Sequence, residues 1–478
     1  MRFFRRRGAG LPGDKPKPAS IRVALMFSGA QQYTDFLITF PSIMILSRLL
    51  TPAQVGVYSV AVAFVNLVHM LRDFGTTEYL VQVKTLDRDT TRSAFTVTLV
   101  IAWTLAAAIF LASPLIADFF NEDGLGNVLR ILSITYLLLP IGSTTSALLV
   151  RDMQFGIRYK INTTELVVQN VVTISLAWYG WGYYSPAWGA VAGMVTTVLG
   201  CLYWGRHHRI RGIGLKQWRP VLEFGSKKTF GTIMTQLGEG APDFVIGRLL
   251  GFAQVGMFSR GYGLVRMFNE NLSGAISAVS YSAFSQQHRD GGSASSLFLR
   301  SITYITGVGW PFLGFASLMS FPIIRVFFGD QWDAAAPILR YLAMASALSL
   351  LVLQYQNLLT AVGRVGLATL WMTAWQILTV GALSAGAFIS ITAVAVALVP
   401  ATAIAVAGVF VGLIMYTDIT FRDYMHAVVP SLGLALFALI PPVVLHLFFA
   451  PTPDHILGPL VSGGCVLIIG GLAGAWWL

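Results

Sequence analysis

Charged residues and cysteines are scarce in this chain, and each shortage excludes a class of protein. Only 11% of the 478 residues are charged, whereas 55% are hydrophobic. A water-soluble globule of this size needs more polar surface than that, so the chain belongs in a bilayer. The two cysteines, Cys201 and Cys465, both lie in apolar stretches. We therefore expect no disulfide, no metal site and no redox role.

Motifs for nucleotide hydrolysis and for metal-dependent catalysis are also absent from the sequence. The stretch EFGSKKTFG at 223–231 lacks the G-x-x-x-x-G-K-[ST] spacing of a phosphate-binding loop. None of the seven histidines is spaced with carboxylates as a ligand set. We therefore expect a protein that is not an enzyme and that carries no cofactor.

Long uncharged runs are what the sequence has instead. A helix needs about 20 apolar residues to cross the hydrocarbon core of a bilayer, so each run holds one or two membrane spans. The runs are far longer than the roughly 10 residues of a barrel strand and show no strict alternation. They predict an all-α polytopic membrane protein. Its transmembrane helices, about 14 in number, are expected at 22–46, 53–71, 93–114, 125–149, 161–179, 186–204, 226–250, 253–284, 296–321, 334–361, 365–388, 391–416, 424–449 and 456–477.

One twelve-residue phrase occurs twice in the chain. Arg48 to Ser59 reads RLLTPAQVGVYS, and Arg248 to Ser259 reads RLLGFAQVGMFS, with eight of the twelve positions identical. The similarity continues downstream, where the stretch SPLIADFF at 113–120 recurs in the second half as FPIIRVFF at 321–328. Two unrelated apolar stretches would rarely agree to this extent, so the sequence indicates an internal duplication.

The duplication divides the chain into two six-helix lobes and a remainder. A spacing of six helices preserves orientation, so we expect parallel repeats related by an axis along the membrane normal. The expected parts are a basic cytoplasmic arm at 1–21, an N-lobe at 22–205, a basic cytoplasmic connector at 206–225, a C-lobe at 226–417 and a C-terminal helix pair at 418–478.

The Lys and Arg residues indicate the orientation, because they are retained in cytoplasmic loops near helix ends. With both termini in the cytoplasm, 25 of the 32 lie on that side, and the opposite loops include the short acidic stretches ADFFNEDGLG and FFGDQWDAAA. The net charge of +11 is thus dispersed among short loops that face one leaflet. It predicts contact with anionic membrane lipids and not with nucleic acid.

The repeated phrase also carries a family resemblance. A parallel duplication of six helices plus a terminal pair, with R-L-L-x-x-x-Q-V-G-x-[YF]-S after the first helix, resembles the polysaccharide-transport and O-antigen flippase branch of the multidrug/oligosaccharidyl-lipid/polysaccharide exporter superfamily. The stretch ALLVRDMQFGIRYK at 147–160 is similar to that branch as well.

The resemblance implies a protein of the bacterial inner membrane that moves undecaprenyl-diphosphate-linked oligosaccharide between leaflets by alternating access of two lobes. The cargo would be an O-antigen, exopolysaccharide or capsule repeat unit. Glycosyltransferases and a polymerase of the same pathway would be its partners, and we expect a monomer.

Polar side chains at membrane depth are the candidate site, because they are costly there and usually face a cavity or a partner. A guanidinium supplies fixed, bidentate charge to a diphosphate, and carboxylates are natural ion sites. The substrate-binding candidates are Arg260, Arg266, Gln31, Gln32 and Gln236; the ion-coupling candidates are Asp35, Glu239 and Asp243; the gate or ion-pair candidates are Glu165 and Glu270.

Several of these residues also have a structural interpretation. Arg266 and Glu270 are i, i+4 neighbours that could neutralise each other. Glu165 lies near a helix end. It could form a gate contact, or it could be a surface acid whose side chain reaches the membrane interface, and both interpretations stay open. Arg260 has no acid three or four residues away, so the sequence favours a structural ion pair less for Arg260 than for Arg266.

Two other function classes stay open. An ion-coupled multidrug or cation antiporter of the same superfamily would prefer acidic and aromatic cavity residues; Asp35, Glu239 and Asp243 favour it, whereas Arg260 and Arg266 count against it. A membrane glycan polymerase or ligase would need a substantial periplasmic loop, and the expected outer loops are short. The sequence identifies neither the glycan nor the coupling ion.

Overall fold

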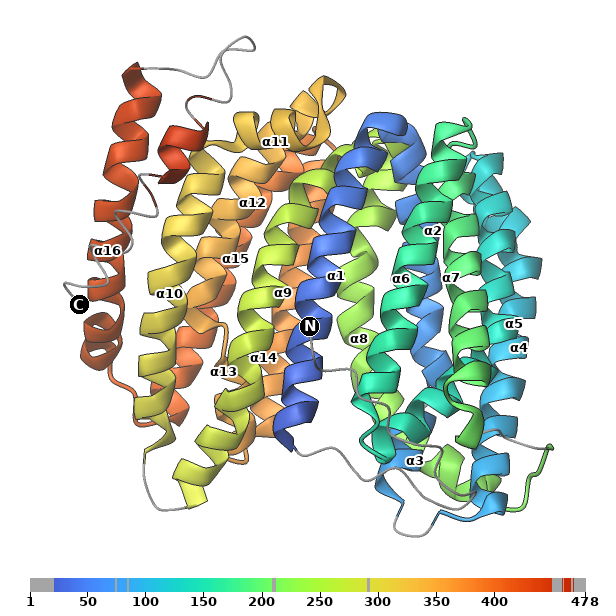
Figure 1. Cartoon of the computed structure of the whole chain (residues 1–478). Coiled ribbons are helices and arrows are strands. Elements are labelled where there is room, and N and C mark those ends of the chain that lie inside the picture. The colour runs from blue at the N-terminus through green and yellow to red at the C-terminus, as the bar shows by residue number, and fades with distance from the viewer. Residues whose placement is uncertain are drawn as a thin grey trace, which may run out of the picture.

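A computed structural model describes residues 21–73, 75–83, 86–208, 212–289, 293–448, 458, 460–465 and 467. These residues form helices and turns with no β-strand (Figure 1), which confirms the all-α prediction for this part of the chain. The basic arm before Ile21 and most of the helix expected at 456–477 lie outside the described residues.

The first half of the chain contains α1 (Ile21–Leu49), α2 (Pro52–Asp73), α3 (Thr76–Gln82), α4 (Arg88–Phe120), α5 (Asp123–Arg151), α6 (Phe155–Trp178), α7 (Tyr184–Tyr203) and the 3₁₀ turn η1 (Arg206–His208). The second half contains α8 (Trp218–Leu249), α9 (Phe252–Arg289), α10 (Ala294–Leu318), α11 (Ser320–Phe328), η2 (Asp330–Ala335), α12 (Ala336–Ser349), η3 (Leu350–Val352), α13 (Tyr355–Ala361), α14 (Val365–Ala387), α15 (Ile391–Tyr416) and α16 (Phe421–Phe448).

Apolar length separates these helices into two groups. Among the described residues, eight helical segments are long and apolar enough to cross a membrane, and the bent pair α10 and α11 would make a ninth. Four other long helices, α1, α6, α8 and α9, fall outside this group. They carry every polar candidate named from the sequence.

Several predicted helix ends differ from the structure by five residues or more; α4 continues to Phe120, beyond the end expected at 114, and α6 begins at Phe155, before the start expected at 161. The helix expected from Ser226 begins at Trp218, so α8 takes up the end of the expected connector; Pro220 lies in its first turn, where proline has no hydrogen bond to lose. The segment expected as a loop after α2 contains α3, which begins after Gly75 in a left-handed conformation (φ 64°). The expected start at Ser93 is also late, because Asp87 caps α4 by accepting a 2.6 Å hydrogen bond from the backbone N–H of Thr90.

One helix expected in the second half is not continuous. The span expected at 296–321 breaks after Leu318, and α11 turns away from α10 by 78°. Pro322 cannot donate to the carbonyl of Leu318, so the α10 ladder ends there. The span expected at 334–361 lies in one segment, Asp330–Ala361, that is long and apolar enough to cross a membrane, although the 3₁₀ turns η2 and η3 lie on either side of α12.

The same neighbours recur in the two halves. In the first half α1 packs on α6, α4 on α5, α5 on α7 and α6 on α7. In the second half α8 packs on α14, α10 on α12, α12 on α15 and α14 on α15. Each pair in one half has its sequence counterpart in the other, as expected from an internal duplication.

The two copies of the repeated phrase meet at the centre of the molecule, where α2 packs on α9. A Cβ at Gly56 would lie 1.8 Å from the carbonyl oxygen of Phe252, and one at Gly256 would lie 2.0 Å from that of Pro52. Only glycine permits two backbones to approach so closely. Ser59 Oγ and Ser259 Oγ are 3.5 Å apart on the same face.

Further hydrogen bonds hold the halves together at the end of the bundle that carries the repeated phrase, called here the repeat end. Trp332 Nε1 donates to the carbonyl of Ser47 at 2.6 Å, and Arg48 donates to the carbonyl of Val326 at 3.1 Å. Figure 1 shows α11 at this end and α3 at the opposite end. We call that opposite end, where η1 leads toward α8, the linker end.

Candidate functional site

Two cavities flank α9 where the halves meet. One, the α2–α8–α9 cavity, has a volume of about 200 Å³ and lies between these three helices. The other, the α1–α9–α11 cavity, has a volume of about 230 Å³. Ser259, Gly263 and Arg266 line both, so α9 is their common wall.

The α2–α8–α9 cavity is polar and contains charges of both signs. Glu239 and Asp243 line it from α8; their i, i+4 spacing places them on one face of that helix. Arg266 lines it from α9, and Asn66 of α2 adds an amide. Two carboxylates opposite one guanidinium can bind a cation or exchange protons.

The α1–α9–α11 cavity is lined by Arg260, Arg266 and Glu270 together with residues of α1 and Phe328 of α11. The guanidinium carbon of Arg260 lies 5.0 Å from the ring centroid of Trp332 and 5.8 Å from that of Phe328. Such cation–π contacts orient a guanidinium without neutralising it.

Arg260 forms no ion pair within the described residues, and its buried Nε has no hydrogen-bond partner there. Trp332, against which it packs, is fully buried and is held by Ser47. The cation is therefore held in place by rings, and its hydrogen-bonding capacity is left for a ligand.

Arg266 and Glu270 form an i, i+4 ion pair, with Nε and Oε1 3.6 Å apart. The Arg266 side chain is 60% exposed and that of Glu270 is 68% exposed. An exposed pair at this distance is weak, so Arg266 can exchange Glu270 for a stronger anionic partner that enters either cavity.

The candidates on α1 have partners of their own. Gln31 donates to Asp35 at 2.5 Å, within the same helix. Gln32 donates to Asn271 of α9 at 3.1 Å, so it bridges the two halves. Neither Gln31 nor Asp35 lines the two cavities. The side chain of Gln236 lies outside the described residues.

Glu165 is separated from the candidates that line the two cavities. It lies on α6, with its Cγ 3.5 Å from the position that a Cβ would take at Gly193 of α7, and it lines neither cavity. The structure therefore brings together Arg260, Arg266, Glu270, Glu239 and Asp243, and leaves Glu165 inside the first half.

Several residues of the site were not selected from the sequence. Tyr58, Ser59 and Ser259 line the α2–α8–α9 cavity. All three belong to the repeated phrase, which was the signal that could have found them. Trp332 had no such signal, because it reaches Arg260 only when the α11–η2 corner folds over α9.

Comparisons with known proteins place this geometry in context. Residues 45–337 match the profile of a family described as polysaccharide biosynthesis protein. The chain is 23% identical over 330 residues to the lipopolysaccharide biosynthesis protein WzxC of Escherichia coli, an alignment that covers 68% of this chain and 66% of that protein. It is 24% identical over 449 residues to the succinoglycan biosynthesis transport protein ExoT of Rhizobium meliloti, covering 90% and 87%.

The alignment with the teichuronic acid biosynthesis protein TuaB of Bacillus subtilis, 26% identical over 280 residues, covers 56% of each chain. The matches to WzxC and TuaB thus span less than two thirds of those two relatives.

Solved structures share the architecture. The lipid II flippase MurJ in an inward closed conformation superimposes with a TM-score of 0.73 and 14% identity, covering 93% of this chain and 98% of that one. An inward-facing multidrug resistance transporter of the MATE family superimposes with a TM-score of 0.65 and 14% identity, covering 82% and 97%. At this identity the likeness concerns the fold alone.

Proposed function

Because the chain belongs to the polysaccharide biosynthesis protein family, we propose that it is a flippase for undecaprenyl-diphosphate-linked oligosaccharide in the bacterial inner membrane. The family match confirms the resemblance drawn from the repeated phrase. The cargo is an O-antigen, exopolysaccharide or capsule repeat unit, and the movement is alternating access of the two halves. The observation that carries the proposal is Arg260, a cation held on two aromatic rings at a cavity wall with no ion pair among the described residues.

A diphosphate is the chemical group that fits this cation. It carries at least two negative charges, and an unpaired charge is costly away from water. A guanidinium offers it bidentate hydrogen bonds. The first copy of the repeat has Val60 and Asn66 at the positions of Arg260 and Arg266. The fold does not require these two cations, so a role in binding accounts for them.

The packing between the halves supports a lipid-linked cargo. On one side α2 packs along α8, whereas the described residues of the corresponding pair, α1 and α9, do not pack along the length of the two helices. Gln32 and Asn271 bridge that pair, and the α1–α9–α11 cavity lies between the two helices. A cargo that enters here keeps its polyprenyl tail in the bilayer while its diphosphate meets Arg260.

The contacts at the repeat end indicate which side is open. Backbone contact at Gly56 and Gly256 closes that end, so this arrangement receives cargo from the linker end. We assign the linker end to the cytoplasm on the distribution of Lys and Arg, with both termini on that side. We propose no catalytic step and no cofactor; an ion gradient or consumption of the product drives net transport.

A cation antiporter is the second candidate. Glu239 and Asp243 line the α2–α8–α9 cavity together, and paired carboxylates favour a cationic cargo. In the flippase these acids act as coupling sites, whereas in the antiporter they bind the cargo itself. The two functions therefore differ in whether Arg260 is needed.

The test measures lipid-linked oligosaccharide on each leaflet in cells that carry variants. Arg260→Ala should reduce export by about tenfold or more, the scale of a lost charge-assisted hydrogen bond, and Arg260→Lys should restore it only in part because the bidentate fork is lost. Arg248→Ala is the matched control, since Arg248 also packs on a ring, Phe119 at 5.1 Å, but lines neither cavity. Full export by an Arg260→Ala, Arg266→Ala double variant would remove both residues from the mechanism and favour the antiporter.

A further inference from the structure

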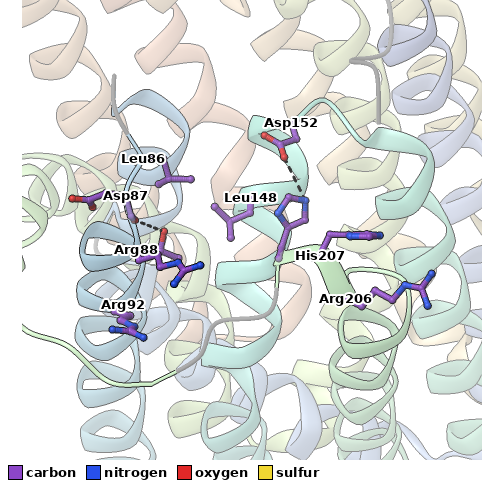
Figure 2. Close-up of a pocket in the computed structure, with 10 residues that line it drawn as sticks. Leu86, Asp87, Arg88, Arg92, Leu148, Asp152, Arg206 and His207 are labelled. Carbon is purple, nitrogen blue, oxygen red and sulfur yellow. Dashed lines mark hydrogen bonds and ion pairs between the residues drawn. The ribbon is translucent and has the colours of Figure 1, made fainter. Parts of the chain in front are cut away.

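A third cavity lies at the linker end, away from the site between the halves. It has a volume of about 470 Å³ and is lined by the first turn of α4, the end of α5 and η1. Figure 2 shows Arg88 and Arg92 on one side, Arg206 and His207 on the other, and Asp152 above them. Three arginines and two histidines, His207 and His208, thus surround one concavity that also holds two aspartates.

Asp87 is already engaged by hydrogen bonds, whereas Asp152 faces a histidine. Asp87 accepts hydrogen bonds from the backbone N–H of Thr90 at 2.6 Å and from Gln217 Nε2 at 3.4 Å; the bonds from Thr90 are the main reason why the pKa of Asp87 is lowered. Asp152 lies 3.5 Å from His208 Nε2. Burial lowers the pKa of His208, so this histidine adds little positive charge at neutral pH.

Two of the three arginines, Arg88 and Arg206, are less engaged than Asp87. Within the described residues, Arg88 and Arg206 form no hydrogen bond and no ion pair, and both are exposed. They approach the cavity from α4 and from η1, which are far apart in sequence. Two guanidinium groups around one concavity match an anion that accepts several hydrogen bonds, as a phosphate does.

The cavity adjoins the segment that joins the two halves. Gly214 donates its N–H to Thr96 Oγ1 at 3.0 Å, and Gln217 donates its N–H to Ser93 Oγ at 3.0 Å. These bonds hold residues 212–217 against the first turns of α4. An anion bound by Arg88 and Arg206 would join η1, at the start of this connection, to the same helix.

Apolar side chains of the connecting segment indicate where the cavity lies relative to the membrane. Ile213 is 70% exposed, Leu215 55% and Trp218 41%. Exposed Trp and aliphatic side chains beside Lys216 and Arg219 are typical of a surface that lies in the membrane interface. Phosphates of lipid headgroups occupy that depth, and anionic ones are enriched on the cytoplasmic side.

We propose that the cavity between α4, α5 and η1 is a binding site for a phosphate group, supplied by an anionic lipid headgroup, that fastens the connection between the halves to the first half. Soluble phosphate shares the chemistry and is the alternative source. The site is separate from the cargo cavities, and the proposal does not depend on what the protein transports.

The experiment titrates the purified full-length protein with short-chain phosphatidylglycerol and, separately, with inorganic phosphate, and counts bound ligand by native mass spectrometry. Zwitterionic phosphatidylcholine is the headgroup control. Arg88→Gln with Arg206→Gln should weaken phosphatidylglycerol binding by about tenfold or more. The matched control is Arg219→Gln with Arg422→Gln, which removes the same charge from exposed positions that do not line the cavity.

Saturable phosphatidylglycerol binding that only the cavity variant weakens would support the lipid source. Saturable binding of inorganic phosphate without any preference for the lipid would support the phosphate site and reassign its source. Equal weakening in both double variants would show general surface attraction and overturn the proposal. The absence of saturable binding by either probe would overturn it as well.

Discussion

At the scale of single residues, the structure separates three carboxylates that the sequence grouped together. Glu239 and Asp243 line the α2–α8–α9 cavity opposite Arg266. Asp35 accepts a hydrogen bond from Gln31 of its own helix and lines neither cavity between the halves. A coupling ion that enters from the cavity therefore meets the α8 pair first.

This difference gives a test of ion coupling. We expect Glu239→Gln and Asp243→Asn to make transport insensitive to an uncoupler, because each variant loses a charge that faces the cavity. Asp35→Asn should retain most of the uncoupler response, since an amide at that position can still accept from Gln31. Export by each variant is measured with and without the uncoupler. A response that is lost in Asp35→Asn and kept in both α8 variants would place coupling on α1.

The sequence could identify the cationic residues of the site but not their surroundings. Arg260 and Arg266 stood out because the other copy of the repeat has Val60 and Asn66 at these positions. Trp332 could not be found in this way, since its contact with Arg260 exists only in the folded chain. The same holds for the bond from Gln32 to Asn271, because helical periodicity says nothing about which helices become neighbours.

At the scale of helices, the contact between α2 and α9 depends on two glycines. A methyl group at Gly56 or Gly256 would lie about 2 Å from a carbonyl oxygen of the other helix, far inside van der Waals contact. Gly56→Ala and Gly256→Ala should therefore cost the closed repeat end about 1–3 kcal/mol each, the usual range for inserting a group into packed structure.

A disulfide between Ser59→Cys and Ser259→Cys reports this closure, because the two hydroxyl oxygens are 3.5 Å apart. In a background without Cys201 and Cys465, the cross-link should form readily, and either glycine variant should lower its yield. Gly381→Ala is the control, since a Cβ there meets nothing within 4 Å. If the cross-link forms with an undiminished yield in both glycine variants, the close contact of α2 with α9 is not what keeps the repeat end closed.

The sequence predicted where the helices occur, but it did not predict all of their ends and breaks. Long uncharged runs placed the apolar spans well, because length and hydropathy decide whether a segment can cross a bilayer. The start of α4 was missed although Asp87 is a good N-cap. The break before α11 required attention to Pro322, whose missing N–H ends the ladder inside an otherwise apolar run.

At the scale of the whole molecule, the orientation in the membrane is the most direct prediction. Ala53 and Ala253 are 200 positions apart in the two copies of the repeated phrase, and both are exposed at the repeat end. Cysteines at both positions should react with a membrane-impermeant thiol reagent in intact cells. Ser293→Cys at the linker end should react only after lysis. Opposite labelling of positions 53 and 253 would contradict the parallel duplication.

The attachments of α1 have a consequence for how the halves can move. Midway along α1, the Thr34 hydroxyl lies 3.0 Å from that of Tyr159 on α6, in the first half. Near its end, Ser47 accepts a hydrogen bond from Trp332, in the second half. Between its middle and the repeat end, the helix thus passes from an attachment to the first half to an attachment to the second, and Pro41 lies between the two.

Separation of the repeat end must therefore break the bond from Trp332 or be absorbed as a hinge within α1. Pro41 donates no backbone hydrogen bond to Leu37, so the hinge costs least at that turn. Thr39 and Phe40, which line the cavity of Arg260, are part of the same turn. Opening of the repeat end would then reshape the wall of the α1–α9–α11 cavity, where we propose that the diphosphate binds. The same movement would open the exit and loosen the hold on the cargo.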